Sequence, residues 1–229
     1  MQTRTLAEKT ADRLMALIRE EGYGAGDRLP TEKDLCAQLG VGRNTLREAL
    51  KLLASRNVVT IRQGAGTYVA ENPGVVDDPL GFSLVTDRRK LTQDLLQIRL
   101  ILEPSIAALA AQCATQADIG ELEEVLLALE GAVCRQESFW ELDVAYHRKI
   151  AECTHNSVMK NLIPIISGGV HVYSGEVSSQ EYHQTQETHR RIFEAIRRHS
   201  AFDAEMEMRY HLLYNQKRYL SEIQNSSHE

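Results

Sequence analysis

The sequence predicts a mainly α-helical protein in two parts: a small N-terminal unit of three helices with a β-hairpin, and an all-helical bundle. Three observations support this fold class. Two short amphipathic segments flank a turn at 40–42, and two β-branched runs flank a glycine-containing loop at 63–66. Beyond residue 80 the apolar residues recur at helical spacing and no strand pattern is visible. Between the two parts, residues 71–80 contain two prolines, a glycine and two adjacent acids, which indicates a linker.

The N-terminal unit, residues 1–70, begins with three predicted helices. The first covers about 5–21 and is followed by closely spaced glycines, and Thr31 with Asp34 forms a capping-box pattern at the start of the second. The third runs from about Arg43 to Ser55, with one apolar stripe and a polar, exposed side. Strand-like runs at 58–62 and 67–69 then complete a winged helix-turn-helix.

The second part, residues 81–229, reads as helices throughout. Its helical segments are expected near 88–112, 116–135, 137–154, 156–177, 179–199 and 201–224. An antiparallel helical bundle with short connections is the natural architecture for such a pattern.

The start of the third helix carries side chains suited to reading DNA bases. An arginine can pair with the guanine edge and an asparagine with the adenine edge in the major groove. Arg43, Asn44 and Arg47 lie within about one turn of each other, and Lys33 in the second helix can contact phosphate. Solvated surface charge is the alternative, but the turn, the polar face and the hairpin together favour DNA binding.

The distribution of charge supports a local rather than a general polyanion-binding surface. The whole chain has 26 basic and 32 acidic residues, yet residues 41–62 hold five basic side chains and one acidic one. A basic patch on an acidic body suits sequence-selective binding. The four cysteines show no CxxC spacing, so buried thiols in a reducing compartment are expected. No signal peptide or 18-residue apolar stretch is visible, so we expect a soluble, cytoplasmic protein.

A second group of polar residues occurs within the predicted bundle. Asp143 and His147 are spaced i, i+4 on one helix face, which suits either a surface ion pair or a metal site. His189 and His211 each lie beside the core-facing residues of their own helices, where an unpaired ring is costly. Three imidazoles and a carboxylate could bind Zn²⁺, Ni²⁺ or Mn²⁺, although chain order does not show that they converge.

Arg99 lies in a helical run that is apolar around most of its circumference, at 95–102. A charge there needs a compensating anion. One possible partner is Glu103, four residues further along the same helix. The other is a ligand carboxylate held bidentately by the guanidinium group. The sequence pattern by itself leaves both partners open.

The N-terminal motifs resemble those of GntR-family bacterial regulators. The resemblance covers about residues 6–70 and rests on LPTEKDL, GVGRNTLREALKLL and IRQGAGTYV. It implies a winged helix-turn-helix whose DNA contacts are Lys33, Gly42, Arg43, Asn44, Arg47, Gln63 and Gly64. Gly42 departs from the family pattern, in which Ser or Thr caps the helix and touches phosphate. Glycine still caps a helix at a cost of a few tenths of a kcal/mol, but it offers only backbone to the DNA.

The helical part resembles the FCD domain of the FadR-like GntR branch across about residues 90–222. Its marks are IRLILEPSIAALAA, DVAYHRKIAECTHNSVMKNL, ETHRRIFEAI and the final helix with His211. The resemblance implies that Asp143, His147, His189 and His211 hold a divalent metal and that Arg99 binds a small carboxylate effector.

The two resemblances together imply a homodimeric, ligand-responsive transcription regulator, most simply a repressor, that binds operator DNA and is not an enzyme. Two other functions remain open from the sequence. One is a metalloenzyme fused to a DNA-binding module, because open coordination positions can activate water. The other is a constitutive repressor in which the metal is purely structural.

Overall fold

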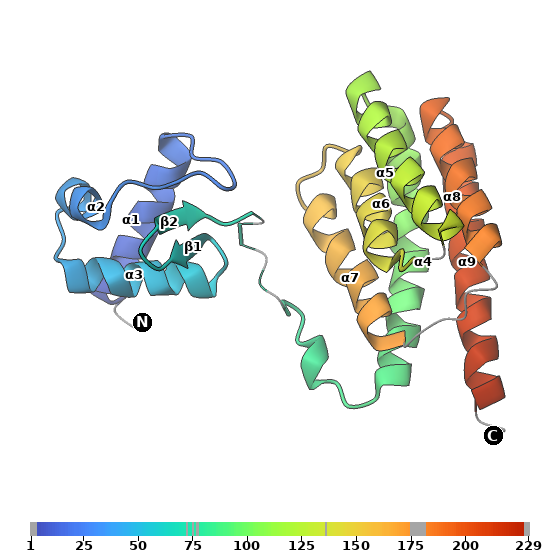
Figure 1. Ribbon diagram of the computed structural model, residues 1–229, viewed down its shortest axis with the longest axis horizontal. Coiled ribbons are helices and arrows are strands. Elements are labelled where there is room, and N and C mark those ends of the chain that lie inside the picture. The colour runs from blue at the N-terminus through green and yellow to red at the C-terminus, as the bar shows by residue number, and fades with distance from the viewer. Residues whose placement is uncertain are drawn as a thin grey trace. The chain divides into compact units, whose positions relative to one another are not determined.

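In a computed structural model the chain forms two compact units, residues 1–79 and 80–229 (Figure 1). The structure describes residues 4–71, 73–74, 76, 78–135, 137–174 and 182–226. Each unit has its own apolar core, so each is described by itself.

The N-terminal unit has the predicted three helices and hairpin, and this confirms the winged helix-turn-helix. Its elements are α1 (Leu6–Glu20), α2 (Glu32–Leu39), α3 (Arg43–Ser55), β1 (Val59–Arg62) and β2 (Gly66–Val69). The two strands are antiparallel, with Val59 paired to Val69 and Arg62 paired to Gly66. Arg28, ahead of α2, bridges to Tyr68 and so extends the hairpin at its edge.

Local capping explains where these helices begin and end. Thr5 and Glu8 form a capping box at the start of α1, and the Thr31 side chain accepts a hydrogen bond from the Asp34 amide at α2. Gly40 ends α2 with φ 62°, a left-handed conformation that favours glycine. The turn between α2 and α3 therefore depends on a residue without a side chain. Gly42 is the N-cap of α3 and makes no side-chain capping bond.

The hydrophobic core of this unit lies between the three helices and the hairpin. Its largest fully buried side chains are Leu14, Leu35, Leu46, Leu50 and Leu53. They occupy the apolar stripe predicted for α3 and the facing sides of α1 and α2. Burial of that stripe leaves the opposite face of α3 to solvent. Part of the expected linker also belongs here, because the Gly74 amide donates a 2.9 Å hydrogen bond to the Asn57 carbonyl.

The second unit is the expected all-helical bundle. After a short 3₁₀ helix, η1 (Phe82–Leu84), it contains α4 (Arg88–Cys113), α5 (Gln116–Cys134), α6 (Trp140–Glu152), α7 (Met159–Ser174), α8 (Tyr182–Arg197) and α9 (Ala201–Ser226). The long helix α4 packs against α9 and α7 and also contacts α6 and α8, so it is the spine of the bundle (Figure 1).

Helices α6 and α7 begin later than the sequence pattern predicts, whereas the start predicted near 179 for α8 lies outside the described residues. Helix α6 starts at Trp140 rather than near 137, and α7 starts at Met159 rather than near 156. The Asn156 side chain accepts hydrogen bonds from the amides of Val158 and Met159, at 2.9 and 3.2 Å. Asparagine in this arrangement caps a helix from outside rather than entering it.

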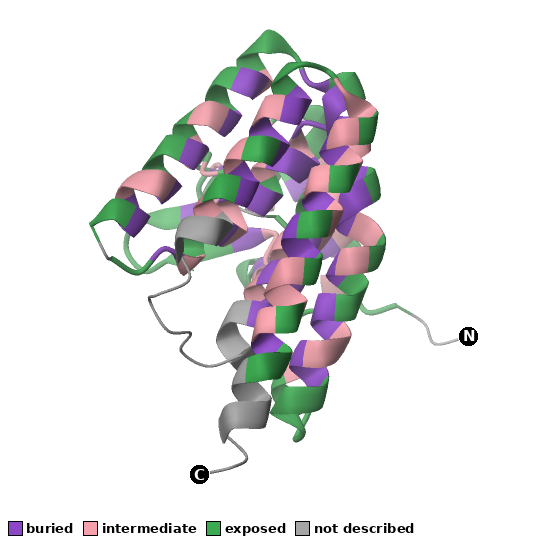
Figure 2. Ribbon diagram, turned by 90° about the vertical axis from the view of Figure 1, so that its right-hand side faces the viewer, coloured by how far each residue is buried: buried purple, intermediate pink, exposed green. Residues whose placement is uncertain are grey.

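The core of the bundle consists of one large and one smaller apolar cluster. The large cluster includes Leu122, Leu126, Tyr146, Ile150 and Phe193, all fully buried. In Figure 2 the buried residues lie along the inward sides of the helices, and the exposed residues lie outside. The smaller cluster joins the first half of α4 to α7 and α9, and η1 packs against it through Phe82.

The thiols differ from the expectation that all four are buried. Cys153 is buried, and its burial raises the pKa of that thiol to about 12. Cys36 is only partly covered, and Cys113 and Cys134 are exposed. The prediction was wrong for the last two because they occupy the outward side of the final turns of α4 and α5. In the described part of the chain, no helix is long and apolar enough to cross a membrane.

Two adjacent glycines in α7 have different surroundings. A Cβ on Gly169 would lie 3.0 Å from Cδ1 of Leu95 and 3.2 Å from Cε2 of Phe82, whereas a Cβ on Gly168 would meet nothing within 4 Å. Leu95 is buried in the smaller apolar cluster, so it has little room to move. The close packing of α4, α7 and η1 therefore depends on Gly169 and not on Gly168.

This difference predicts opposite effects for two alanine substitutions. Gly168→Ala should stabilise the bundle by about 0.5–1 kcal/mol, because alanine loses less backbone entropy in a helix. Gly169→Ala should be about 1–3 kcal/mol less stable than Gly168→Ala, because the added methyl overpacks the core. Urea unfolding followed by circular dichroism measures both. Equal stability of the two variants would contradict the packing described.

Candidate metal centre and candidate DNA-reading surface

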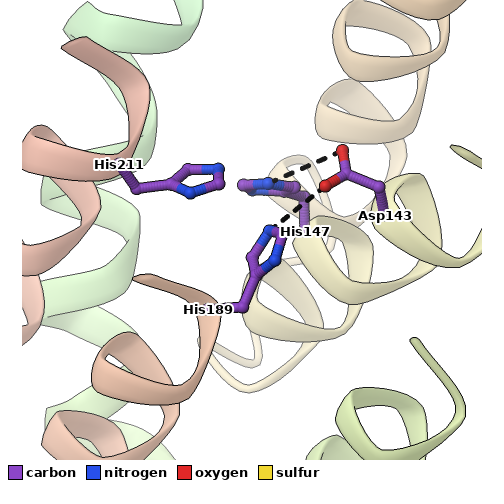
Figure 3. Close-up of side chains that lie close together, drawn as sticks. All are labelled: Asp143, His147, His189 and His211. Atoms are coloured by element: carbon purple, nitrogen blue, oxygen red, sulfur yellow. Dashed lines mark ion pairs between the residues drawn. The ribbon is translucent and has the colours of Figure 1, made fainter. Parts of the chain in front are cut away.

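Four potential metal ligands from three helices meet inside the bundle. Asp143 and His147 come from consecutive turns of α6, His189 from α8 and His211 from α9 (Figure 3). All four are buried, and one ligand atom from each lies within 4.8 Å of the others. The spacing i, i+4 on α6 places two of them on one face, and helix packing brings the other two to it.

The contacts within this cluster connect the carboxylate to two imidazoles. Nε2 of His189 lies 3.1 Å from Oδ1 of Asp143, and Nε2 of His147 lies 3.9 Å from Oδ2. These are the dashed pairs in Figure 3. His211 is held by its own neighbours: Nδ1 is 2.8 Å from the Thr188 hydroxyl, and Nε2 is 3.1 Å from the Asn215 amide nitrogen.

The protonation states suit a cation. Burial lowers the pKa of His189, although Asp143 opposes this, and burial lowers the pKa of His211 well below its ordinary value. Burial by itself raises the pKa of Asp143. The close contact with His189, together with His147 and Arg99 nearby, outweighs it and holds that pKa below its ordinary value. Neutral rings at His189 and His211 beside an ionised Asp143 are the form in which these groups bind a divalent metal.

A metal also accounts for polar atoms that the protein leaves poorly paired. Among the described residues, the ring nitrogens of His147 and His189 have no hydrogen bond of regular geometry. Both rings have carboxylate neighbours, Glu103 and Asp143, but these close contacts do not have the geometry of regular hydrogen bonds. Buried imidazole nitrogens without good partners are costly. Coordination to a cation would satisfy the nitrogens that face the centre, so these residues fit a divalent metal.

Arg99 and Glu103 form a second polar layer beside the four ligands. Nε of Arg99 donates to Oε1 of Glu103 at 2.6 Å, and Nη2 lies 3.5 Å from Oε2. The same carboxylate lies 2.5 Å from Nδ1 of His147 and 3.4 Å from the Ser167 hydroxyl. Of the two partners considered for Arg99, the structure therefore contains the one on its own helix.

The charge of this pair is well compensated despite complete burial. Burial raises the pKa of Glu103, but its contacts with Arg99 and His147 outweigh it and lower that pKa to about 2. Burial lowers the pKa of Arg99, but Glu103 and Asp143 together raise it above its ordinary value. Both groups are therefore ionised near neutral pH.

The residues proposed to read DNA lie on the exposed face of α3 and its surroundings. Arg43, Asn44 and Arg47 are exposed, as are Lys33 on α2 and the loop residues Gln63 and Gly64 between β1 and β2. The Arg47 side chain has a partner within the protein, because its Nε donates a hydrogen bond to Oε2 of Glu32 at 3.0 Å. This contact uses the inner edge of the guanidinium group and orients the side chain along the surface.

The N-terminal unit also has an open cavity of about 430 Å³ between the hairpin loop and the start of α2. Its lining includes Arg28, Arg47 and Arg62, together with Gln63 and Gly64. The guanidinium of Arg62 lies over the Tyr68 ring, 4.4 Å from its centroid. Glu32 also lines the cavity and pairs with Arg47, so the three arginines leave this concave surface with a net positive charge suited to phosphate.

Comparison with known proteins identifies the family. Residues 6–69 match the model described as bacterial regulatory proteins, gntR family, and residues 94–214 match the FCD domain. The chain is 33% identical over 226 residues to an Escherichia coli K12 protein named as a regulator of the L-lactate dehydrogenase operon, covering 92% of this chain and 85% of that protein. The chain belongs to the GntR family.

Two further relatives share both units with this GntR-family chain. The galactonate operon transcriptional repressor of Escherichia coli K12 is 30% identical over 210 residues, which cover 88% of this chain and 90% of the repressor. A solved GntR structure from Streptococcus agalactiae is 40% identical with a TM-score of 0.83, covering 92% of this chain and 99% of that one. The GntR and FCD architecture predicted from the sequence is confirmed.

Family membership fixes the general activity. GntR-family regulators bind operator DNA and typically act as dimers. The relatives are named as transcription regulators and not as enzymes, in agreement with the sequence prediction. FCD domains are associated with metal binding, and the buried cluster of this GntR-family chain is able to hold a metal.

Sequence reasoning missed three residues of the two sites. Glu103 was considered only as a partner for Arg99, although it also contacts His147 on another helix. Arg28 and Arg62 line the same cavity as the predicted loop residues. Their signal in the sequence is weak: each is a single basic residue beside a β-branched or apolar run, and only the pairing of Arg28 with Tyr68 brings it to the hairpin.

Proposed function

We propose that this protein is a repressor that controls genes for the uptake or catabolism of a small organic acid or sugar acid. The acid is sensed by the metal cluster and Arg99, and the winged helix-turn-helix binds the operator. The observation that carries the proposal is the buried ligand cluster beside an ionised arginine, in a chain that also has a DNA-reading unit. Since operators are chromosomal, the protein would act in the bacterial cytoplasm.

In this proposal the start of α3 reads bases and its surroundings hold the backbone. Arg43, Asn44 and Arg47 face the major groove, where arginine and asparagine pair with purine edges. Lys33 and the backbone of Gly42 contact phosphate, as helix N-termini do. Gln63 and Gly64 at the hairpin loop approach the neighbouring backbone. Glu32 supports this arrangement, because it holds the Nε edge of Arg47 and leaves the outer amino groups for a guanine.

The DNA-reading role predicts the effect of Arg47→Ala. Loss of one bidentate base contact in each subunit should weaken operator binding by about 1–3 kcal/mol per half-site, or roughly 5- to 150-fold for each. Fluorescence anisotropy with a duplex selected from a random-sequence pool by the wild-type protein measures this affinity. Arg56→Ala is the matched control, because Arg56 lies at the opposite end of the same helix. Equal affinities for the two variants would count against Arg47 as a reading residue.

The ligand is proposed to be a carboxylate for chemical reasons. A divalent metal binds carboxylate and hydroxyl oxygens, and an arginine clamps a carboxylate. The names of two relatives refer to L-lactate dehydrogenase and galactonate operons, and both lactate and galactonate are hydroxy acids. A purely structural metal in a constitutive repressor is the remaining alternative. In that case the operator affinity would not change with any acid.

Substitution of Arg99 separates sensing from DNA binding. Arg99→Ala should leave the affinity for the selected operator unchanged and abolish its response to acids. The response is measured by anisotropy with L-lactate, galactonate and a panel of sugar acids. Arg190→Ala is the control, since Arg190 pairs with Glu130 elsewhere in the bundle. If Arg99→Ala responds to an acid as the wild type does, Arg99 is not part of the ligand site.

We also propose that two copies associate through one side of α9. Five exposed apolar residues recur there at helical spacing: Phe202, Met206, Tyr210, Leu213 and Leu220. This α9 stripe is nearly symmetric about residue 211, so an antiparallel second copy would place Phe202 opposite Leu220. The same arrangement brings Glu205 opposite Lys217. Beside Leu213, Lys217 and Leu220 lies a hollow of about 470 Å³, which suits a phenyl ring.

A charge placed on the α9 stripe should break this dimer. Leu213→Glu is expected to convert the protein from dimer to monomer. Each of the two copies would bury one carboxylate near the centre of the contact, and burying an unpaired charge is costly. Light scattering after size exclusion gives the mass directly. Leu127→Glu is the control, since Leu127 is also exposed, at 54% against 46% for Leu213, but lies on α5. If Leu213→Glu remains dimeric, the interface lies elsewhere. A mass above that of a dimer would likewise mean that the copies associate through another surface.

A further inference from the structure

Glu103 is not one of the four candidate ligands, but its carboxylate lies directly beside one of them, His147. It lies on α4 with only 2% of its surface exposed. Its carboxylate meets Arg99 on the same helix, His147 on α6 and Ser167 on α7. A single buried carboxylate therefore joins three helices at the edge of the metal cluster.

The contact with His147 determines which ring nitrogen is available to a metal. Nδ1 of His147 lies 2.5 Å from Oε2 of Glu103. Two lone pairs would repel at that distance, so the contact favours a ring proton on Nδ1 even though its geometry is not that of a regular hydrogen bond. A neutral imidazole has one N–H and one lone pair, so the lone pair is then on Nε2. Nε2 is the nitrogen on the side of Asp143, where the other ligands converge.

The contact with Arg99 leaves part of the guanidinium group for a ligand. Glu103 receives Nε at 2.6 Å and lies 3.5 Å from Nη2, which is the side edge of the group. A guanidinium has five N–H donors arranged in a fork, and its end edge carries the outer hydrogens of both amino groups. Among the described residues, the structure shows no hydrogen bond from Nη1 of Arg99. Glu103 and a ligand carboxylate can therefore bind Arg99 at the same time.

We propose that Glu103 is the positioning residue of this site. It fixes the His147 proton on Nδ1, which directs Nε2 to the metal, and it holds the side edge of Arg99, which directs the end edge to the acid. Carboxylates that orient metal-binding histidines in this way are general supports of metal affinity. The statement about Arg99 rests on the proposed sensing function, whereas the statement about His147 does not.

The first test uses the metal alone. Glu103→Gln keeps the size of the side chain but removes its charge and one of its acceptors. Zn²⁺ affinity, measured by competition with a chelating dye, should fall about 10- to 100-fold. Glu130→Gln is the control, because it removes a carboxylate that pairs with Arg190 elsewhere in the same bundle. Unchanged Zn²⁺ affinity in Glu103→Gln would overturn the proposal.

A spectroscopic test separates positioning from a merely structural role. Nitrogen-15 spectra of the metal-free protein distinguish the two tautomers of a neutral histidine ring. The wild type and Glu130→Gln should show His147 with its proton on Nδ1, and Glu103→Gln should show a mixture or the other tautomer. A His147 ring that keeps its proton on Nδ1 without the Glu103 carboxylate would contradict the assignment.

A double variant guards against misfolding, because a lone Arg99 without its partner is a buried uncompensated charge. Arg99→Leu with Glu103→Leu removes both charges, a replacement that folded proteins often tolerate. This variant should bind Zn²⁺ as weakly as Glu103→Gln. Wild-type affinity in the double variant would overturn the proposal.

The sensing half has its own readout. With Zn²⁺ bound at saturation, L-lactate or galactonate should raise the melting temperature of the wild type and of Glu130→Gln, but not that of Glu103→Gln. If no acid affects the wild type, the proposed sensing function fails together with the statement about Arg99. The Zn²⁺ and nitrogen-15 results would still decide the role of Glu103 toward His147.

Discussion

The bundle is organised around a group of polar side chains that cannot be buried separately. Asp143, His147, His189 and His211 come from three helices and are all withdrawn from water. Removing an imidazole or a carboxylate from water without a partner costs several kcal/mol, so the packing of α6, α8 and α9 depends on mutual satisfaction of these groups. Glu103 and Arg99 extend the same constraint to α4, the spine of the bundle.

An arginine held by a glutamate occurs in both units. In the DNA-reading unit, Glu32 receives Nε of Arg47 on the surface. In the bundle, Glu103 receives Nε of Arg99 in the interior. In each case the carboxylate binds the inner edge of the guanidinium, which reduces the freedom of a long side chain before it meets a ligand. The energetic weight differs, because the exposed pair is screened by water and the buried pair is not.

Much of the fold could be predicted from local patterns. The glycines that end α2 and precede α3, the apolar stripe of α3 and the β-branched runs each specify a local structure, and together they specify the winged unit. The i, i+4 spacing of Asp143 and His147 also has a local meaning. No local pattern shows that His189 and His211 converge on that pair, because their convergence depends on how helices distant in the sequence pack. Resemblance to the FCD domain supplied it.

The features that the sequence did not predict are a contact between two distant helices and details at the ends of helices. The contact between Glu103 and His147 joins α4 to α6, and no spacing within either helix indicates it. Cys113 and Cys134 lie beside apolar residues along the chain, yet both point outward where their helices end. Helix α7 begins later than predicted because the Asn156 side chain lies outside the helix and accepts a hydrogen bond from the Val158 amide at its start.

The central claim is that operator binding depends on an acid held at the metal cluster. Its most direct test is the operator affinity of the full chain, titrated with L-lactate, galactonate and sugar acids, first after removal of metal by a chelator and then after restoring Zn²⁺. With metal present, one of these acids should change the affinity by roughly 5- to 150-fold, which corresponds to a coupling of about 1–3 kcal/mol. Without metal the same acid should have no effect. An equal response with and without metal would contradict the account.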